Sequence, residues 1–113
     1  MMIRTTLSAA GLAVMLMAAP LAQAVDADAA QALAKKEGCL KCHALDKKKE
    51  AESLKAIAKK LSGKPDAEAI VLKQITTGVK VKMEDGTEEE HKTIKTKDDA
   101  EIKNMIQWIL SLK

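Results

Sequence analysis

The chain has 113 residues, enough for one small domain, and 31% of them are charged, with a formal net charge of +3. It contains one Trp and neither Phe nor Tyr, although 47% of its residues are hydrophobic. With so few aromatic side chains to stack on bases, and acidic residues interspersed among basic ones, the composition does not favour nucleic-acid binding. A domain of this size has a marginal core and commonly depends on a covalent staple or a cofactor.

Residues 1–24 have the features of a secretory signal peptide. Arg4 supplies a positive charge, residues 7–21 are almost wholly apolar, and Ala22-Gln23-Ala24 is a small-X-small cleavage site. The apolar run is shorter than the ~20 residues that a membrane-spanning helix needs. We therefore expect export to the bacterial periplasm, a mature domain of residues 25–113, and no membrane span after cleavage.

An Ala-rich helix is predicted from about Asp28 to Lys36. Asp26 or Asp28 suits its N-cap, and Gly38 suits its end. The helix therefore leads directly into the next segment, whose sequence is Cys39-Leu40-Lys41-Cys42-His43.

Two cysteines separated by two residues and followed by a histidine form the attachment pattern of c-type haem. The spacing lets the thiols of Cys39 and Cys42 reach two vinyl groups on one edge of the porphyrin, and it carries His43 under the iron as the proximal ligand. A redox dithiol would be expected near a βαβ pattern, which the sequence lacks. A zinc site would need every Cys and His of the chain at an unusual spacing, and a Cys39–Cys42 disulfide would close too small a loop to stabilise much.

Three further helices are predicted downstream. They span about Glu50 to Leu61, a segment starting at Pro65 or Asp66 and stopping at Gly78, and a segment from Asp98 or Asp99 to Leu112. In the third helix of the chain, apolar spacing places Ile70, Val71 and Ile75 on the inner face. Residues 79–97 show no persistent periodicity, but Val79 to Met83 alternates and Asp85-Gly86 suits a turn. An irregular segment of this length in so small a domain is typical of a functional loop.

Residues 26–113 resemble a class I cytochrome c of the short bacterial type, a monohaem periplasmic electron carrier. Besides the haem motif, the segments that carry the resemblance are Ala44-Leu45-Asp46-Lys47-Lys48, Ala58-Lys59-Lys60-Leu61-Ser62-Gly63, Thr76-Thr77-Gly78 and the closing stretch from Asp99 through Trp108 to Lys113. The resemblance implies an all-α fold of about four helices around one covalently attached haem c. It also implies packing of Trp108 near Leu33, where the first and last helices cross.

The same resemblance implies single-electron transfer between periplasmic or membrane-bound redox proteins, no enzymatic activity, and a monomer or weak dimer. Two departures from the family pattern bear on the iron. Family members carry Gly-Pro after the haem histidine, and the proline carbonyl orients the proximal imidazole, whereas here Ala51-Glu52 stands in those places. We therefore expect another backbone carbonyl to accept the proton on the free nitrogen of His43, or that nitrogen to face water.

The second departure concerns the distal ligand, which in the family is a methionine flanked by prolines. No proline follows Gly78, and the only methionines of the predicted mature chain are Met83 and Met105, the latter within the last predicted helix. His91 precedes Trp108 by 17 residues, the usual interval between the family's ligand methionine and its tryptophan. We therefore predict His91 as the distal ligand, with Met83 and a vacant or weakly held site as the alternatives.

A second imidazole in place of a thioether favours ferric iron, so the sequence predicts a carrier of low potential. Acidic residues cluster around His91, and lysines flank the haem motif, which makes a dipolar protein the expectation. The competing hypothesis is a haem-based binder or sensor of small ligands with a labile or absent distal ligand. Catalysis at the haem lacks an acid or base other than His91.

Overall fold

The computed structural model describes residues 10–15 and 24–113. The predicted signal peptide and its cleavage site therefore lie largely outside the described residues. Residues 10–15 form neither helix nor strand, and the side chains of Leu12 and Met15 are exposed. Within the described part of the chain, no helix is long and apolar enough to cross a membrane.

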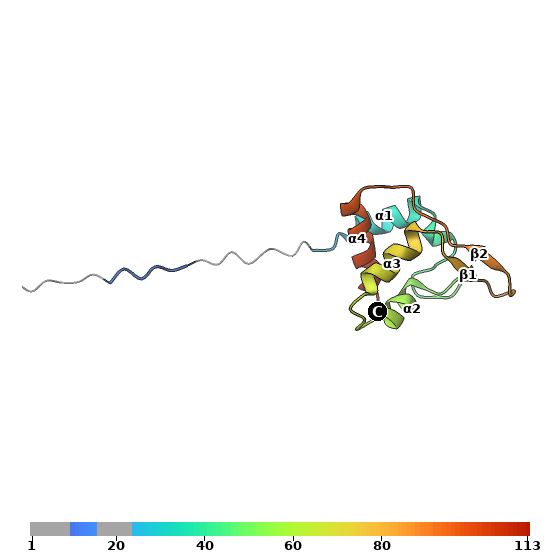
Figure 1. The fold of residues 1–113 in the computed structure, drawn as a ribbon, viewed down its shortest axis with the longest axis horizontal. Coiled ribbons are helices and arrows are strands. Elements are labelled where there is room, and N and C mark those ends of the chain that lie inside the picture. Colours follow the sequence, from blue (N-terminus) through green and yellow to red (C-terminus); the bar gives the residue numbers. More distant parts are fainter. Residues whose placement is uncertain (1–9, 16–23) are drawn as a thin grey trace, which may run out of the picture.

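Four α-helices and one short hairpin make up the domain (Figure 1). In chain order the elements are α1 (Ala27–Lys36), a 3-10 turn η1 (Cys39–Lys41), α2 (Leu54–Leu61), α3 (Ala67–Thr76), β1 (Lys80–Lys82), β2 (Glu88–Glu90) and α4 (Asp99–Leu110). The all-α fold expected from the sequence is thus confirmed, with a two-stranded sheet added to it.

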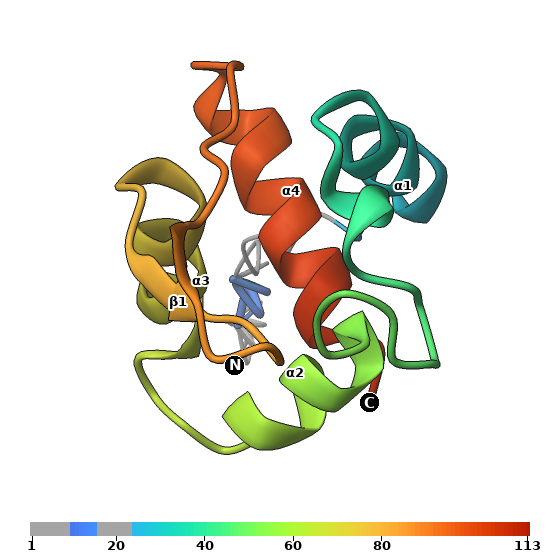
Figure 2. The same cartoon turned by 90° about the vertical axis from the view of Figure 1, so that its right-hand side faces the viewer.

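Helix α4 is the element against which the others pack. Figure 2 shows α4 in the middle of the domain, with α1 on one side, α3 on the other and α2 beside its C-terminal end. Met105 is fully buried, and Trp108 joins Leu33 of α1 in one core cluster. The small side chains of Ala30 and Ala34 are buried in the same cluster, which lets α1 approach closely.

Side-chain caps begin three of the helices. Asp26 accepts a hydrogen bond from the Ala29 amide, and Asp98 accepts from the amides of Ala100 and Glu101. Ser53 accepts from the Ala56 amide, so α2 begins at Leu54. The predicted start near Glu50 was therefore wrong. The helical spacing of the sequence continues back to Glu50, but residues 50–53 follow an irregular path that tertiary contacts hold.

Helix α3 buries a narrower face than its sequence predicts. Val71 and Ile75 are buried, but the side chain of Ile70 is 36% exposed, so its predicted inward position was wrong. Leu72 on the same helix is 43% exposed. Only one side of α3 meets α4, so apolar residues off that side remain in contact with water.

The hairpin occupies the first part of the segment that showed no persistent periodicity. Lys80 pairs with Glu90 and Lys82 with Glu88 in antiparallel register, which places opposite charges across the two strands. Gly86 closes the turn at a φ of 85° that other residues rarely adopt. The sequence predicts β1 and the turn, but not β2, because three consecutive glutamates have no alternation of apolar and polar residues.

Candidate haem site

The haem motif folds as one tight turn after α1. Gly38 adopts a φ of 81°, which ends α1 and starts η1. The amide of His43 then donates to the Cys39 carbonyl over 3.0 Å, so the two cysteines and the histidine lie within one turn of backbone. Both cysteines are free, and no disulfide joins them. Two thiols and an imidazole in one turn are the donor set that covalent haem attachment requires.

The environment of Cys39 weighs against a redox dithiol. Burial raises the pKa of the Cys39 thiol above its ordinary value, and the nearby carboxylate of Glu37 raises it further. A reactive cysteine needs a lowered pKa, because the thiolate is the nucleophile. A bare metal site is not formed either: among residues 10–15 and 24–113, no three His, Cys, Asp or Glu side chains cluster as metal ligands.

The ring of His43 is oriented by a backbone carbonyl. Its Nδ1 donates to the carbonyl oxygen of Glu52 over 2.6 Å, which leaves Nε2 free to bind a metal. A backbone carbonyl therefore accepts this proton, as expected, and the nitrogen does not face water. The acceptor lies at Glu52, the position compared above with the family's proline, and not at another place in the chain. The carbonyl is kept although the side chain has changed, because the acceptor belongs to the backbone.

The loop that carries this carbonyl is held by its own backbone. The Ala51 amide donates to the Cys42 carbonyl over 3.0 Å, and the Leu54 amide donates to Ala44 over 2.9 Å. These bonds fold residues 44–54 back beneath the haem motif. They also explain why α2 cannot begin at Glu50.

His91 lies where the hairpin ends. Its amide donates to the Val79 carbonyl over 2.8 Å, one pair beyond the last paired strand residues, and its Nδ1 donates to the Lys92 carbonyl over 2.9 Å. The side chain is half-buried, and this burial lowers the pKa of His91; the charge of His43 lowers it further. A neutral imidazole with Nδ1–H engaged presents the lone pair of Nε2 for a metal.

The structure brings the rings of His43 and His91 together. Their centres are 6.2 Å apart and their planes are tilted by 38°. Two imidazoles on opposite sides of one metal, each with a bond of about 2 Å from nitrogen to metal and about 1 Å from nitrogen to ring centre, require a separation of about 6 Å. The ring pair therefore fits a single haem iron between the two histidines.

The two methionines of residues 25–113 occupy different positions. Met83 is half-buried at the end of β1, where its amide donates to Thr87 and its carbonyl accepts from Gly86. Met105 is fully buried in the core at α4.

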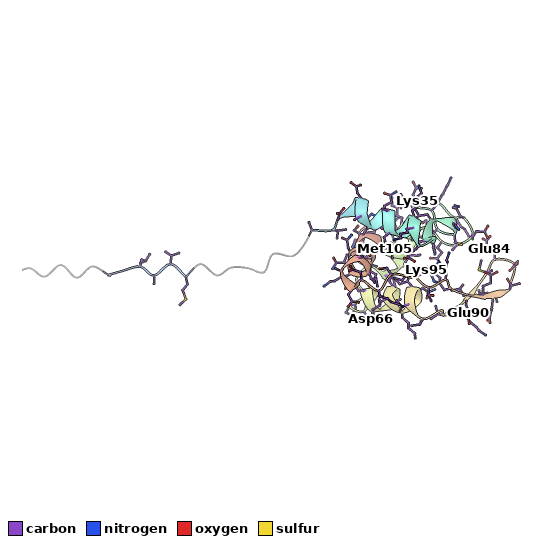
Figure 3. The ribbon with its side chains drawn as sticks, turned by 90° about the horizontal axis from the view of Figure 1, so that it is seen from above. Lys35, Asp66, Glu84, Glu90, Lys95 and Met105 are labelled. Atoms are coloured by element: carbon purple, nitrogen blue, oxygen red, sulfur yellow. The ribbon has the colours of Figure 1, made fainter. Side chains whose placement is uncertain are left out.

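Charged side chains surround this end of the domain. Lys48, in the loop after the haem motif, forms an ion pair with Glu84 next to the hairpin turn, and this bond raises the pKa of Lys48. Figure 3 shows Glu84 and Glu90 at the hairpin, at the end of the domain away from Asp66. The two partners of the ion pair are both largely exposed, so the contact adds little stability.

Comparison with known proteins defines the class of protein. The family model described as Cytochrome c matches residues 27–113, and the chain belongs to that family. It is a class I monohaem cytochrome c with one covalently bound haem c. Class I cytochromes c are electron carriers.

Two solved structures of bacterial cytochromes are similar to the chain in sequence and fold. The crystal structure of the class 1 cytochrome MtoD from Sideroxydans lithotrophicus ES-1 is 51% identical, covers 79% of this chain and 98% of its own, and has a TM-score of 0.76. The structure of cytochrome c552 from Nitrosomonas europaea is 31% identical, covers 74% of this chain and 99% of its own, and has a TM-score of 0.58. No curated protein matches significantly.

Two functional groups of the site were not anticipated from the sequence. One is the Glu52 carbonyl, which no side-chain pattern can reveal. The other is the buried carboxylate of Glu37, at the C-cap of α1. An acidic residue at a helix C-terminus interacts unfavourably with the helix dipole. This unfavourable position was the sequence signal that could have pointed to a special role for Glu37.

Proposed function

We propose that the protein is a periplasmic single-electron carrier whose haem iron is bound by His43 and His91, with Cys39 and Cys42 as the covalent attachment points. The observation that carries this proposal is the approach of the two imidazole rings to 6.2 Å between centres, in a site whose haem motif carries two free thiols. Each ring donates its Nδ1–H to a backbone carbonyl, so each has Nε2 available.

When bound, the haem supplies a centre that gains and loses one electron. The residues of the chain set how easily it does so. Two imidazoles donate more strongly than an imidazole and a thioether, so ligation by His91 favours the ferric state and a low potential. The carbonyls of Glu52 and Lys92 strengthen this donation, because a hydrogen bond from Nδ1 makes the opposite nitrogen more basic.

Absorption spectra of the ferric and ferrous protein test the ligand set. We expect a low-spin wild-type protein without the far-red band of a methionine–iron bond, and high-spin ferric iron in His91→Ala. Met83→Ala is the matched control, because it removes the alternative ligand from the same hairpin segment. A spectrum unchanged in His91→Ala, or a high-spin spectrum in Met83→Ala, would show that His91 is not the ligand.

Export is the second part of the proposal. We propose that residues 1–24 are removed as a signal peptide, so that the periplasmic protein begins at Val25. The mass of the purified protein should equal residues 25–113 plus one haem. A mass that retains residues 1–24 would contradict cleavage.

The partners that fit this site are other periplasmic or membrane-bound redox proteins. The competing hypothesis, a binder or sensor of small ligands, needs a distal face that is free or readily vacated. The 6.2 Å separation of the two ring centres supports the carrier instead. We propose that the carrier acts as a monomer or weak dimer. Analytical ultracentrifugation at micromolar concentration tests this oligomeric state.

A further inference from the structure

Glu37 carries a buried carboxylate that the proposed ligand set does not use. Among the described residues, Glu37 and Ser53 are the polar side chains counted as buried, and Glu37 is only 8% exposed. Ser53 has a local role, since it caps α2. A buried carboxylate is costly unless its oxygens are hydrogen bonded, so the partners of Glu37 indicate what it does.

Both carboxylate oxygens of Glu37 accept hydrogen bonds from backbone amides. The Lys95 amide donates to Oε2 over 2.7 Å and the Thr96 amide donates to Oε1 over 3.2 Å. Hydrogen bonds to an ionised carboxylate are stronger than those between neutral groups. The carboxylate therefore anchors two successive residues that lie 58 and 59 positions further along the chain.

The anchored residues belong to the segment that follows the distal histidine. We call residues 91–98 the distal strap; it has neither helix nor strand and joins the hairpin to α4. Figure 1 shows it passing the C-terminal end of α1 on its way to α4. Its other backbone anchors are the amide of His91 on Val79 and the amide of Ile94 on Ile75.

Glu37 also sits two residues before Cys39, at the C-cap of α1. Its side chain thus ties the distal strap to the element that leads into the haem motif. The other bonds of the strap run to the hairpin, to α3 and to α4, where Thr96 Oγ1 donates to Glu101 over 3.1 Å. The Glu37 carboxylate is the group at the end of α1, beside the haem motif, to which strap amides donate.

We propose that Glu37 is the positioning residue of the distal ligand: it fastens the strap so that His91 stays opposite His43. This inference rests on the proposed function, because it requires His91 as the ligand. Glu37 touches neither the iron nor His91, and it acts through the backbone of Lys95 and Thr96. A weaker anchor allows His91 to leave the iron more often.

The rate at which cyanide binds to the ferric holoprotein measures how often His91 leaves. Glu37→Gln keeps the volume of the side chain but loses the charge and one acceptor oxygen. We expect cyanide to bind about tenfold faster in this variant. Ser53→Ala is the matched control, because it removes the other buried polar group and destabilises α2 without touching the strap. Its cyanide rate should stay within about twofold of wild type.

His91→Ala separates this inference from the proposal on which it rests. In that background the distal face is open, so adding Glu37→Gln should bring no further acceleration. If His91→Ala speeds cyanide binding but Glu37→Gln does not, or if Ser53→Ala speeds it as much as Glu37→Gln, the role of Glu37 is overturned alone. If His91→Ala leaves the rate and the spectrum unchanged, both the ligand assignment and this inference fail.

Hydrogen exchange of the wild-type holoprotein provides a test that needs no variant. The amides of Lys95 and Thr96 should exchange with deuterium at least about tenfold more slowly than the amide of Lys97 in the same strap. Equal exchange at the three amides would show that Glu37 does not hold the strap in solution.

Discussion

Asp26 and Asn104 exchange two hydrogen bonds between the first turn of the domain and the middle of α4. The Asp26 amide donates to the side-chain oxygen of Asn104, and the side-chain nitrogen of Asn104 donates to the Asp26 carbonyl, each over 2.9 Å. The pair fastens the beginning of α1 to a helix 78 positions later in the chain. It therefore holds the domain together one residue after the predicted new N-terminus at Val25.

Asn104→Ala should lower the free energy of unfolding of the holoprotein by about 1–2 kcal/mol, because both hydrogen bonds are lost together. Urea titration followed by far-UV circular dichroism measures the change. Lys103→Ala, at the exposed neighbouring position of α4, is the control and should stay within about 0.5 kcal/mol of wild type. Equal losses in the two variants would contradict a role for the Asp26–Asn104 pair.

Glu52→Ala should leave the absorption spectrum of the holoprotein unchanged. His43 donates to the backbone carbonyl of Glu52, which the substitution retains. The side chain of Glu52 forms an exposed ion pair with Lys60 at 2.8 Å, so the loss of stability should be less than about 1 kcal/mol. A changed spin state in Glu52→Ala would mean that the side chain, rather than the carbonyl, orients His43.

Gly38→Ala should cost about 1–2 kcal/mol of stability, because Gly38 has a φ of 81°. A new Cβ would also lie 2.8 Å from Nζ of Lys92, but this atom ends a flexible side chain that can turn away. Gly63→Ala is the matched control, with a φ of 79° and no neighbouring atom within 4 Å. Denaturant titrations should give similar losses for the two variants, and a much larger loss at Gly38 would show that Lys92 is held in place.

The stability of the holoprotein should fall as the pH drops below about 6.5. Burial lowers the pKa of His91 in the folded chain. The proposed bond to iron would lower it further, since a ligand must lose its proton to bind a metal, so in this range the unfolded chain binds a proton that the folded chain does not. The stabilising contribution is therefore complete above the ordinary histidine pKa and is lost on acidification. His91→Ala should show a shallower loss between pH 7 and 5 in thermal unfolding. Identical slopes in the two proteins would contradict this linkage.

The sequence by itself determined the features that depend on neighbouring residues. The haem motif and the turn at Gly86 follow from local spacing and backbone preference, and the apolar stripes predict the helices. Local preference narrowed two N-caps to Asp26 or Asp28 and to Asp98 or Asp99, and the structure shows Asp26 and Asp98. The resemblance of the closing helix to the family also placed Trp108 in the core that the structure shows. The interval from Trp108 singled out His91, and the structure brings its ring centre to 6.2 Å from that of His43; ligation of the iron remains a prediction.

Only the tertiary structure decided the features that depend on residues far apart in the chain. The acceptor for His43 is a backbone carbonyl, which no residue type encodes, and the start of α2 depends on bonds that fold residues 44–54 under the haem motif. Strand β2 forms because its glutamates pair with the lysines of β1, and Glu37 is buried because amides 58 and 59 residues away bind it. Such groups are satisfied by long-range partners, and local sequence patterns do not specify those partners.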